Sequence, residues 1–121
     1  MPRESSMPLD AAPRVIEIRT AFPSREDAER CGRDLLDRRL AACVQVDGPV
    51  TSLYRWQGRI ESAAEFRCTC KTSGERADDC VAAIRGMHPY ELPELLAWEA
   101  AGGSADFISW VIGQTRRPRP G

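Results

Sequence analysis

No long apolar run occurs in this chain of 121 residues, and its N-terminus lacks a basic flank followed by an apolar stretch. The sequence therefore predicts neither a transmembrane helix nor a secretory signal, and we expect a cytoplasmic protein. An excess of charge of one sign is also missing, because 17 basic and 18 acidic residues leave a formal net charge of −1. Without a strong overall field, we expect neither nucleic acid nor a membrane as a partner.

Side chains that ligate metals are few and scattered. The chain has a single histidine, His88, and five cysteines without a C-x-x-C pair. The cysteines are Cys31, Cys43, Cys68, Cys70 and Cys80. Their odd number and spacing are typical neither of a disulfide framework nor of a structural zinc site with four protein ligands. We expect most of these thiols to be reduced and buried, and we expect no organic cofactor.

The length and the 42% hydrophobic content are enough for one domain with one core. The first thirteen residues contain three prolines and little apolar content, and the closing TRRPRPG is basic and proline-rich. We therefore expect a disordered tail at 1–13 and a mobile tail at 115–121, on either side of a folded domain at 14–114.

Apolar periodicity predicts the element order βαββαβ, followed by a C-terminal helix. A β-branched run at 14–20 predicts a first strand, and apolar residues at helical spacing after Ser24 predict a helix over 24–39. Two β-rich runs then lead into a strand at about 60–71. The later run ELLAWEA predicts the last strand.

Turn and capping residues separate these elements. Asp47-Gly48-Pro49 should bend or bulge its strand, whereas Gln57-Gly58 is the expected hairpin reversal. Thr72 and Glu75 have the spacing of a capping box for a second helix, which should end at the His88-Pro89 step because proline disfavours helical geometry in the residue before it. Ser104 can cap the final helix.

This order is typical of an α+β, ferredoxin-like fold, in which two helices cover one face of a four-stranded antiparallel sheet. The strands carry apolar residues on both faces, as Val15 and Ile16 illustrate. We therefore expect the second sheet face to pack on another subunit.

Five motifs resemble the CutA divalent-ion tolerance family. In chain order they are RLAACVQV at 39–46, TSLYRWQG at 51–58, EFRCTCKT at 65–72, MHPYELPELL at 87–96 and GGSADFISWV at 102–111. The resemblance covers nearly the whole expected domain. It implies a ferredoxin-like fold assembled into a homotrimer, with an architecture related to PII signalling proteins, and a role in tolerance of divalent metals, copper above all.

The chain departs from that family at Arg19, where some members have a cysteine, at Phe107, where some have tyrosine, and at Gln57, where glutamate is frequent. The resemblance implies Cys43 as a metal ligand, because this cysteine matches one in those members. His88 is the other candidate ligand, since imidazole suits divalent transition metals. Alternatively, His88 holds its corner of the chain by hydrogen bonds.

A ligand cleft between subunits is the expected site. Its candidate residues are Glu65, Lys71, His88, Tyr90, Trp56 and Trp110. Alternation places Glu65 and Lys71 on one face of their strand, and Cys68 and Cys70 on the other, where we expect core packing. The alternative for the charged face is a network of salt bridges between subunits.

The leading hypothesis is a homotrimeric binding or signalling module for Cu(II), another divalent metal or a small ligand. A second hypothesis is an enzyme that uses Lys71, Glu65 and His88 for proton transfer, although the sequence contains no G-x-S-x-G, H-E-x-x-H or phosphate-binding loop. A third is a trimeric scaffold that recruits a protein partner.

Overall fold

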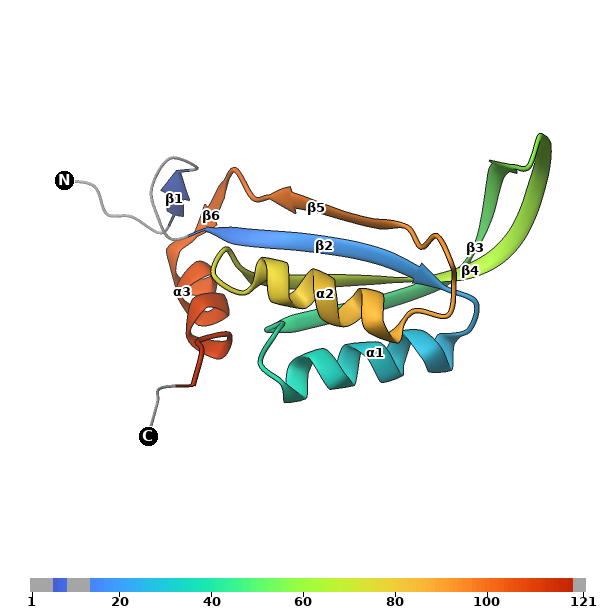
Figure 1. The fold of residues 1–121 in the computed structure, drawn as a ribbon. Helices are drawn as coiled ribbons and strands as arrows, with labels where there is room; N and C mark the ends of the chain where they lie inside the picture. Colours follow the sequence, from blue (N-terminus) through green and yellow to red (C-terminus); the bar gives the residue numbers. More distant parts are fainter. Residues whose placement is uncertain (1–5, 9–13, 119–121) are drawn as a thin grey trace.

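The computed structural model describes residues 6–8 and 14–118. Figure 1 shows their arrangement. In chain order the elements are β1 (Ser6–Pro8), β2 (Val15–Phe22), α1 (Arg25–Asp37), β3 (Cys43–Trp56), β4 (Arg59–Ser73), α2 (Ala77–Met87), β5 (Leu95–Glu99), β6 (Gly102–Ser104) and α3 (Ala105–Gln114).

Four strands form an antiparallel sheet in the order β3-β4-β2-β5, and α1 and α2 lie side by side along one of its faces (Figure 1). This arrangement confirms the predicted α+β, ferredoxin-like fold and its C-terminal helix α3. Short strand β1 pairs with β6 in a separate two-stranded sheet. Within the described residues, no helix combines the length and the apolar character needed to cross a membrane.

The main core lies between the sheet and the two covering helices. Strand β2 contributes Ile18 and Phe22, and the helices contribute Leu35 and Ile84, all of them almost fully buried. Cys31, Cys68, Cys70 and Cys80 belong to the same core and are free thiols. Hydrogen bonds from neighbouring thiols, together with burial, raise the pKa of Cys31 and of Cys70. The expectation of buried cysteines is confirmed for these four.

The two predicted irregularities of the central hairpin are both present. Gly48 and Pro49 oppose the single residue Phe66, which makes the bulge, and a Cβ on Gly48 would lie 2.7 Å from the Phe66 ring. Gln57 and Gly58, both with positive φ, connect Trp56 to Arg59 in a two-residue turn. Beyond the bulge, the hairpin extends away from the body of the domain (Figure 1).

The predicted capping box of Thr72 and Glu75 is wrong. Thr72 is buried in β4 and pairs with Ile16 of β2, so the antiparallel ladder continues to Ser73. Helix α2 begins only at Ala77, and its N-cap residue Arg76 makes no side-chain capping bond. Thr72 pairs with a neighbouring strand and therefore does not cap the helix, although its local sequence had predicted that it would.

Both expected tails fall partly on residues 1–5, 9–13 and 119–121, which lie outside the described residues. Ser6–Pro8 pairs with Gly102–Ser104. At the other end, Thr115 is fully buried and donates a hydrogen bond to the Val111 carbonyl oxygen, and Arg117 forms ion pairs with α2 and the segment before it. Thr115 and Arg117 therefore contact the domain.

Two helical glycines provide a matched test of the packing between α1 and β3. A Cβ on Gly32 would lie 2.8 Å from Val44 Cγ1, whereas a Cβ on Gly86 would have no neighbour within 4 Å. We expect Gly86→Ala to raise the free energy of unfolding by about 0.5–1 kcal/mol through helix propensity. We expect Gly32→Ala to lower the free energy of unfolding by about 1 kcal/mol, because overpacking against Val44 outweighs the gain in helix propensity.

Denaturant unfolding of both variants measures these changes. The double variant Gly32→Ala/Val44→Ala should be no less stable than Val44→Ala alone, because the Val44 methyl group that lies too close to the added Cβ is then absent. Stabilisation by Gly32→Ala in the wild-type background would contradict the close packing.

Candidate functional site

The strand register brings four side chains into one row across the sheet face opposite α1 and α2. Lys71 of β4 pairs with Cys43 of β3 and with Glu17 of β2, and Glu17 pairs with Trp98 of β5. Directly paired residues point to the same face of a sheet. One residue from each strand therefore contributes to this row, which we call the Lys71 row.

Lys71 is the centre of the polar contacts in this row. Its Nζ lies 3.4 Å from Glu17 Oε2 and donates a hydrogen bond to Gln45 Oε1 at 3.1 Å. The ammonium and carboxylate are both partly buried, with side-chain exposures of 25% and 37%. This position limits competition from water without removing the two charges from solvent entirely.

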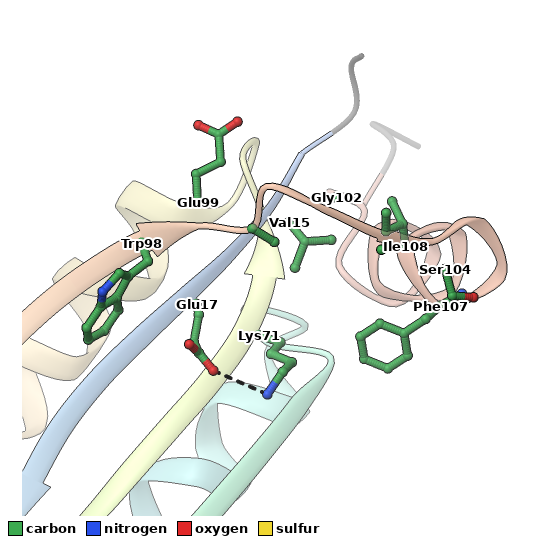
Figure 2. Close-up of a pocket in the computed structure, with 11 residues that line it drawn as sticks. Val15, Glu17, Lys71, Trp98, Glu99, Gly102, Ser104, Phe107 and Ile108 are labelled. Carbon is green, nitrogen blue, oxygen red and sulfur yellow. Dashed lines mark hydrogen bonds and ion pairs between the residues drawn. The ribbon is translucent and has the colours of Figure 1, made fainter. Parts of the chain in front are cut away.

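A pocket of about 410 Å³ opens beside the Lys71 row. Figure 2 shows Glu17 and Lys71 pointing toward one another, with Trp98 on one side and Phe107 on the other. The Gly102–Ser104 backbone forms another part of its lining. The pocket thus combines a paired cation and anion with two aromatic rings, an arrangement suited to a small polar ligand.

Further charges on the same face are also paired. Arg67 makes two hydrogen bonds to Asp47 Oδ2, at 2.6 and 3.1 Å. The guanidinium of Arg19 lies over the Trp98 ring at 5.1 Å from its centroid. Arg19 therefore uses its charge in a cation–π contact with an aromatic residue of the pocket.

A second group of predicted residues meets at the corner after α2. Tyr90 donates a hydrogen bond from its hydroxyl to Glu65 Oε2 at 2.9 Å. The His88 ring stacks on Phe22, with centroids 4.4 Å apart, and tilts against Tyr90 at 5.0 Å. Burial, and to a smaller extent the hydrogen bond to Glu65, raise the pKa of Tyr90 to about 12.

Both ring nitrogens of His88 have partners. Nε2 lies 2.8 Å from the Ala21 carbonyl oxygen, and Nδ1 accepts a hydrogen bond from the Tyr90 backbone N–H at 3.2 Å. A carbonyl only accepts and an amide N–H only donates, so these partners assign the neutral tautomer with its proton on Nε2. Burial lowers the pKa of His88, opposed by the bond to Ala21 and the charge of Glu65. The structure therefore supports the corner-holding alternative for His88.

The predicted cleft residues form two groups within one chain. Glu65, Tyr90 and His88 lie at the corner, whereas Lys71 is six residues from Glu65 along β4, or roughly 20 Å at the usual strand rise. Trp56 lies at the tip of the hairpin. A shared cleft would therefore require more than one copy of the chain.

Trp110 lies in α3, and its ring centroid is 5.7 Å from that of Phe107, one of the residues that line the pocket. Of the residues that line the pocket, only Lys71 belongs to the sequence-based set; those that were missed include Glu17, Trp98 and Phe107. The strand register, which pairs Glu17 with both Lys71 and Trp98, is the signal that would have identified two of them.

The part of the chain that the structure describes contains no group of three or more His, Cys, Asp or Glu side chains arranged to hold a metal ion. Cys43 is half-buried and stands next to Lys71 in the register. His88 would have to lose one hydrogen bond to coordinate a metal. A metal site that uses either residue would therefore need additional donors from water or from another copy.

Comparisons with known proteins agree with this fold. Residues 16–114 match the family model described as CutA1 divalent ion tolerance protein. The chain is 37% identical over 89 residues to the divalent-cation tolerance protein CutA of Archaeoglobus fulgidus, a match that covers 74% of this chain and 86% of that one. It is 33% identical over 102 residues to the protein of the same name in Pectobacterium atrosepticum, covering 84% of this chain and 93% of that one.

Solved structures are similar over the same region. The divalent ion tolerance protein CutA1 from Ehrlichia chaffeensis superposes with a TM-score of 0.83 at 27% identity, covering 88% of this chain and all of that one (100%). The Archaeoglobus fulgidus CutA structure, described as a periplasmic divalent cation tolerance protein, has a TM-score of 0.81 at 33% identity and covers 84% and 99%.

The burial of His88 makes stability depend on pH. Because burial lowers the pKa of this residue on folding, the unfolded chain binds more protons as the pH falls below the ordinary value of 6.5. The contribution of neutral His88 to the stability is therefore fully present above pH 6.5. It is lost as the pH falls from that value toward the folded pKa. We expect the melting temperature of the wild type to fall more steeply than that of His88→Gln between about pH 7.5 and pH 5.5.

Thermal unfolding over this range measures the difference. His88 is the only histidine, so carboxylates supply the background in both proteins. Parallel pH profiles for the two proteins would contradict a lowered pKa of His88 in the folded protein.

Proposed function

The chain belongs to the CutA1 divalent ion tolerance family, which confirms the resemblance of its five motifs, and from this premise we propose that it acts in tolerance of divalent cations as a homotrimeric binding module. Two relatives carry the divalent-cation tolerance name at 33–37% identity over most of their length. The pocket beside the Lys71 row is the observation that supports binding as the activity.

The apolar surface of one chain supports assembly. Leu53 and Ile60 on the projecting hairpin are 71% and 72% exposed, and Leu96 on the edge strand β5 is 59% exposed. Tyr54, Trp56, Trp98 and Trp110 are also substantially exposed. Apolar side chains gathered along a sheet face and a hairpin are typical of a surface that another protein covers.

Assembly would convert open features into clefts. A neighbouring copy packed on the second sheet face would further desolvate the Lys71–Glu17 pair and close the open side of the pocket. In our proposal, that copy also brings its own Tyr90–Glu65 corner near the Lys71 row of the first chain. The ligand clefts that we propose therefore lie between subunits.

Copper is the metal that we propose for these clefts. Thiolate and imidazole are soft or borderline ligands, and Cu(II) has the highest affinity among divalent first-row metals for a given nitrogen or sulfur site. Cys43 is the best-supported donor, because it is half-buried on the open face, whereas His88 already uses both nitrogens. The remaining donors would come from other copies or from water.

Binding is better supported than catalysis. A proton-transfer mechanism needs acid and base groups within hydrogen-bond reach of the same substrate. Within one chain Lys71 contacts Glu17 and Gln45, while Glu65 contacts Tyr90. The three residues of the enzyme hypothesis are thus divided between two places, and the family and the relatives are named for ion tolerance.

Charge on the hairpin should dissociate the assembly. We expect Leu53→Glu and Ile60→Glu each to raise the concentration at which the protein dissociates by at least about a hundredfold, since a buried leucine or isoleucine contributes roughly 1.5–3 kcal/mol and a buried unpaired carboxylate adds a penalty. Size-exclusion chromatography with light scattering measures the mass.

Arg33→Glu is the control, because it places the same carboxylate on an exposed position of α1. Equal masses for the hairpin variants, the control and the wild type at every concentration would refute the proposed role of the hairpin.

Copper binding is tested by native mass spectrometry of the reduced, tag-free protein. We expect the wild type to take up Cu(II) in multiples of three per trimer, and Cys43→Ser to weaken uptake at least about tenfold through loss of a thiolate ligand. His88→Gln should retain uptake. Zn(II) serves as a comparison that does not oxidise thiols.

A wild-type trimer that stays free of metal would rule out direct copper binding and leave a small ligand as the occupant of the clefts. Equal loss of uptake in both variants would overturn the preference for Cys43.

A further inference from the structure

A second pocket, of about 440 Å³, lies within the helical layer and shares no residue with the pocket beside Lys71. It is located where α1 ends and α2 begins. Its lining consists of Arg38, Leu40, Arg76, Asp79, Ala82 and Ala83. Because α1 and α2 cover the sheet face opposite the Lys71 row, this pocket does not depend on the proposed clefts between subunits.

Arg76 is the unusual residue of this pocket. It is only 8% exposed, and its Nε is buried without a hydrogen-bond partner among the described residues. Its Nη2 donates a long hydrogen bond of 3.5 Å to the Arg38 carbonyl oxygen. The nearest carboxylate oxygen, Oδ2 of Asp79, lies 4.0 Å from Nε. A buried guanidinium normally has much closer acceptors, because an unpaired buried charge is destabilising.

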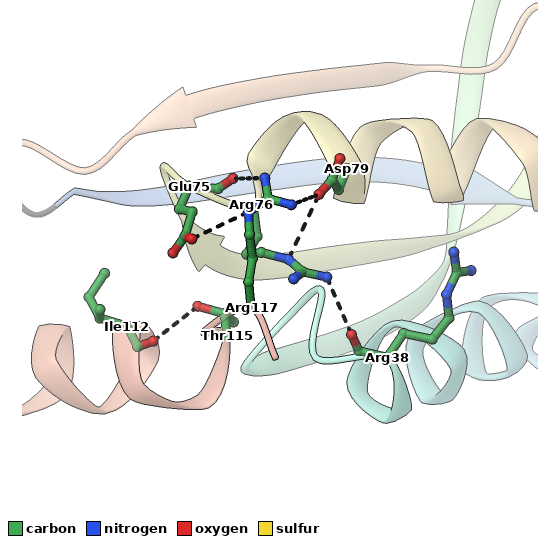
Figure 3. A network of polar contacts seen from close by, with 7 residues as sticks. All are labelled: Arg38, Glu75, Arg76, Asp79, Ile112, Thr115 and Arg117. Atoms are coloured by element: carbon green, nitrogen blue, oxygen red, sulfur yellow. Dashed lines mark hydrogen bonds and ion pairs between the residues drawn. The ribbon is translucent and has the colours of Figure 1, made fainter. Parts of the chain in front are cut away.

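The neighbouring charges are better paired with one another than with Arg76 (Figure 3). Arg117 Nη1 lies 2.9 Å from Asp79 Oδ2, and its Nε lies 3.3 Å from Glu75 Oε2. Arg38 pairs with Asp34 at 2.8 Å. Among these described contacts, Arg76 is thus the one cation without a carboxylate at hydrogen-bond distance.

The start of α2 adds further donors beside Arg76. The helix has eleven residues, and its N-cap makes no side-chain hydrogen bond to the first turn. The Cys80 N–H already donates to the Arg76 carbonyl oxygen, whereas the N–H groups of the preceding turn point out of the helix end. These amides and the helix dipole favour an anion at this position.

We propose that this pocket binds a tetrahedral oxyanion, either inorganic phosphate or the phosphoryl group of a small metabolite. Arg76 supplies the buried charge, with the first-turn amides of α2 as further donors, whereas the Arg38 guanidinium is already paired with Asp34. The first-turn carboxylates of Asp78 and Asp79 oppose the anion, and Arg117 already pairs with Asp79. The proposal does not rest on metal binding or on assembly.

Isothermal titration of the full-length protein at low salt, in a buffer without other oxyanions, tests the site with inorganic phosphate and with glycerol 3-phosphate. We expect Arg76→Gln to weaken binding at least about tenfold, because charge-assisted hydrogen bonds are lost. Arg85→Gln is the matched control, since this arginine lies in the last turn of α2 and does not line the pocket. It should leave the affinity unchanged.

Asp79→Asn distinguishes an anion site from a purely structural role of Arg76. Removal of this carboxylate should tighten phosphate binding severalfold, a change in the direction opposite to that of Arg76→Gln, and it keeps the Arg76 side chain in place. Binding of either anion with this pattern supports the proposal, and the tighter of the two identifies the source of the phosphoryl group. Absence of binding by the wild type, or equal affinities for the wild type and Arg76→Gln, would overturn it.

Discussion

The antiparallel register of β4 between β2 and β3 determines where every group on the sheet lies. Alternation along β4 directs Cys68 and Cys70 into the core beneath the helices and directs Lys71 to the opposite face. A shift of one residue would exchange these faces, exposing the thiols and burying an ammonium group. Because the cost of that exchange is large, the core sets the position of the Lys71 row. The pocket is therefore a consequence of the same pairing that stabilises the fold.

Charge pairing on the open face makes this polar surface compatible with the assembly that we propose. Lys71 with Glu17, and Arg67 with Asp47, bring opposite charges together before any partner arrives. A second copy would then cover neutral pairs and exposed apolar side chains, which is less costly than covering single charges. His88 has a different role, because its two hydrogen bonds connect the end of β2 to the chain after α2 and hold Tyr90 beside Glu65.

Local signals in the sequence were sufficient for most of the fold. Apolar periodicity predicted the four sheet strands and the three helices, and Gln57-Gly58 predicted the hairpin turn. The Thr72–Glu75 capping box failed because a local signal could not reveal that β2 pairs with β4 as far as Ser73. Glu17 and Trp98 were missed as pocket residues for the same reason, since three non-consecutive strands had to be aligned. The Ala21 carbonyl, 67 residues from His88, could not be inferred as its partner from the sequence.

Sedimentation equilibrium of the unmodified protein tests the central claim most directly, namely that further copies of the chain complete the open sheet face. The account predicts one species with three times the chain mass of 13.4 kDa, maintained on dilution into the nanomolar range as expected for a large apolar interface. A single species at the chain mass over the whole concentration range would contradict it, because the open face and the hairpin would then remain exposed to solvent.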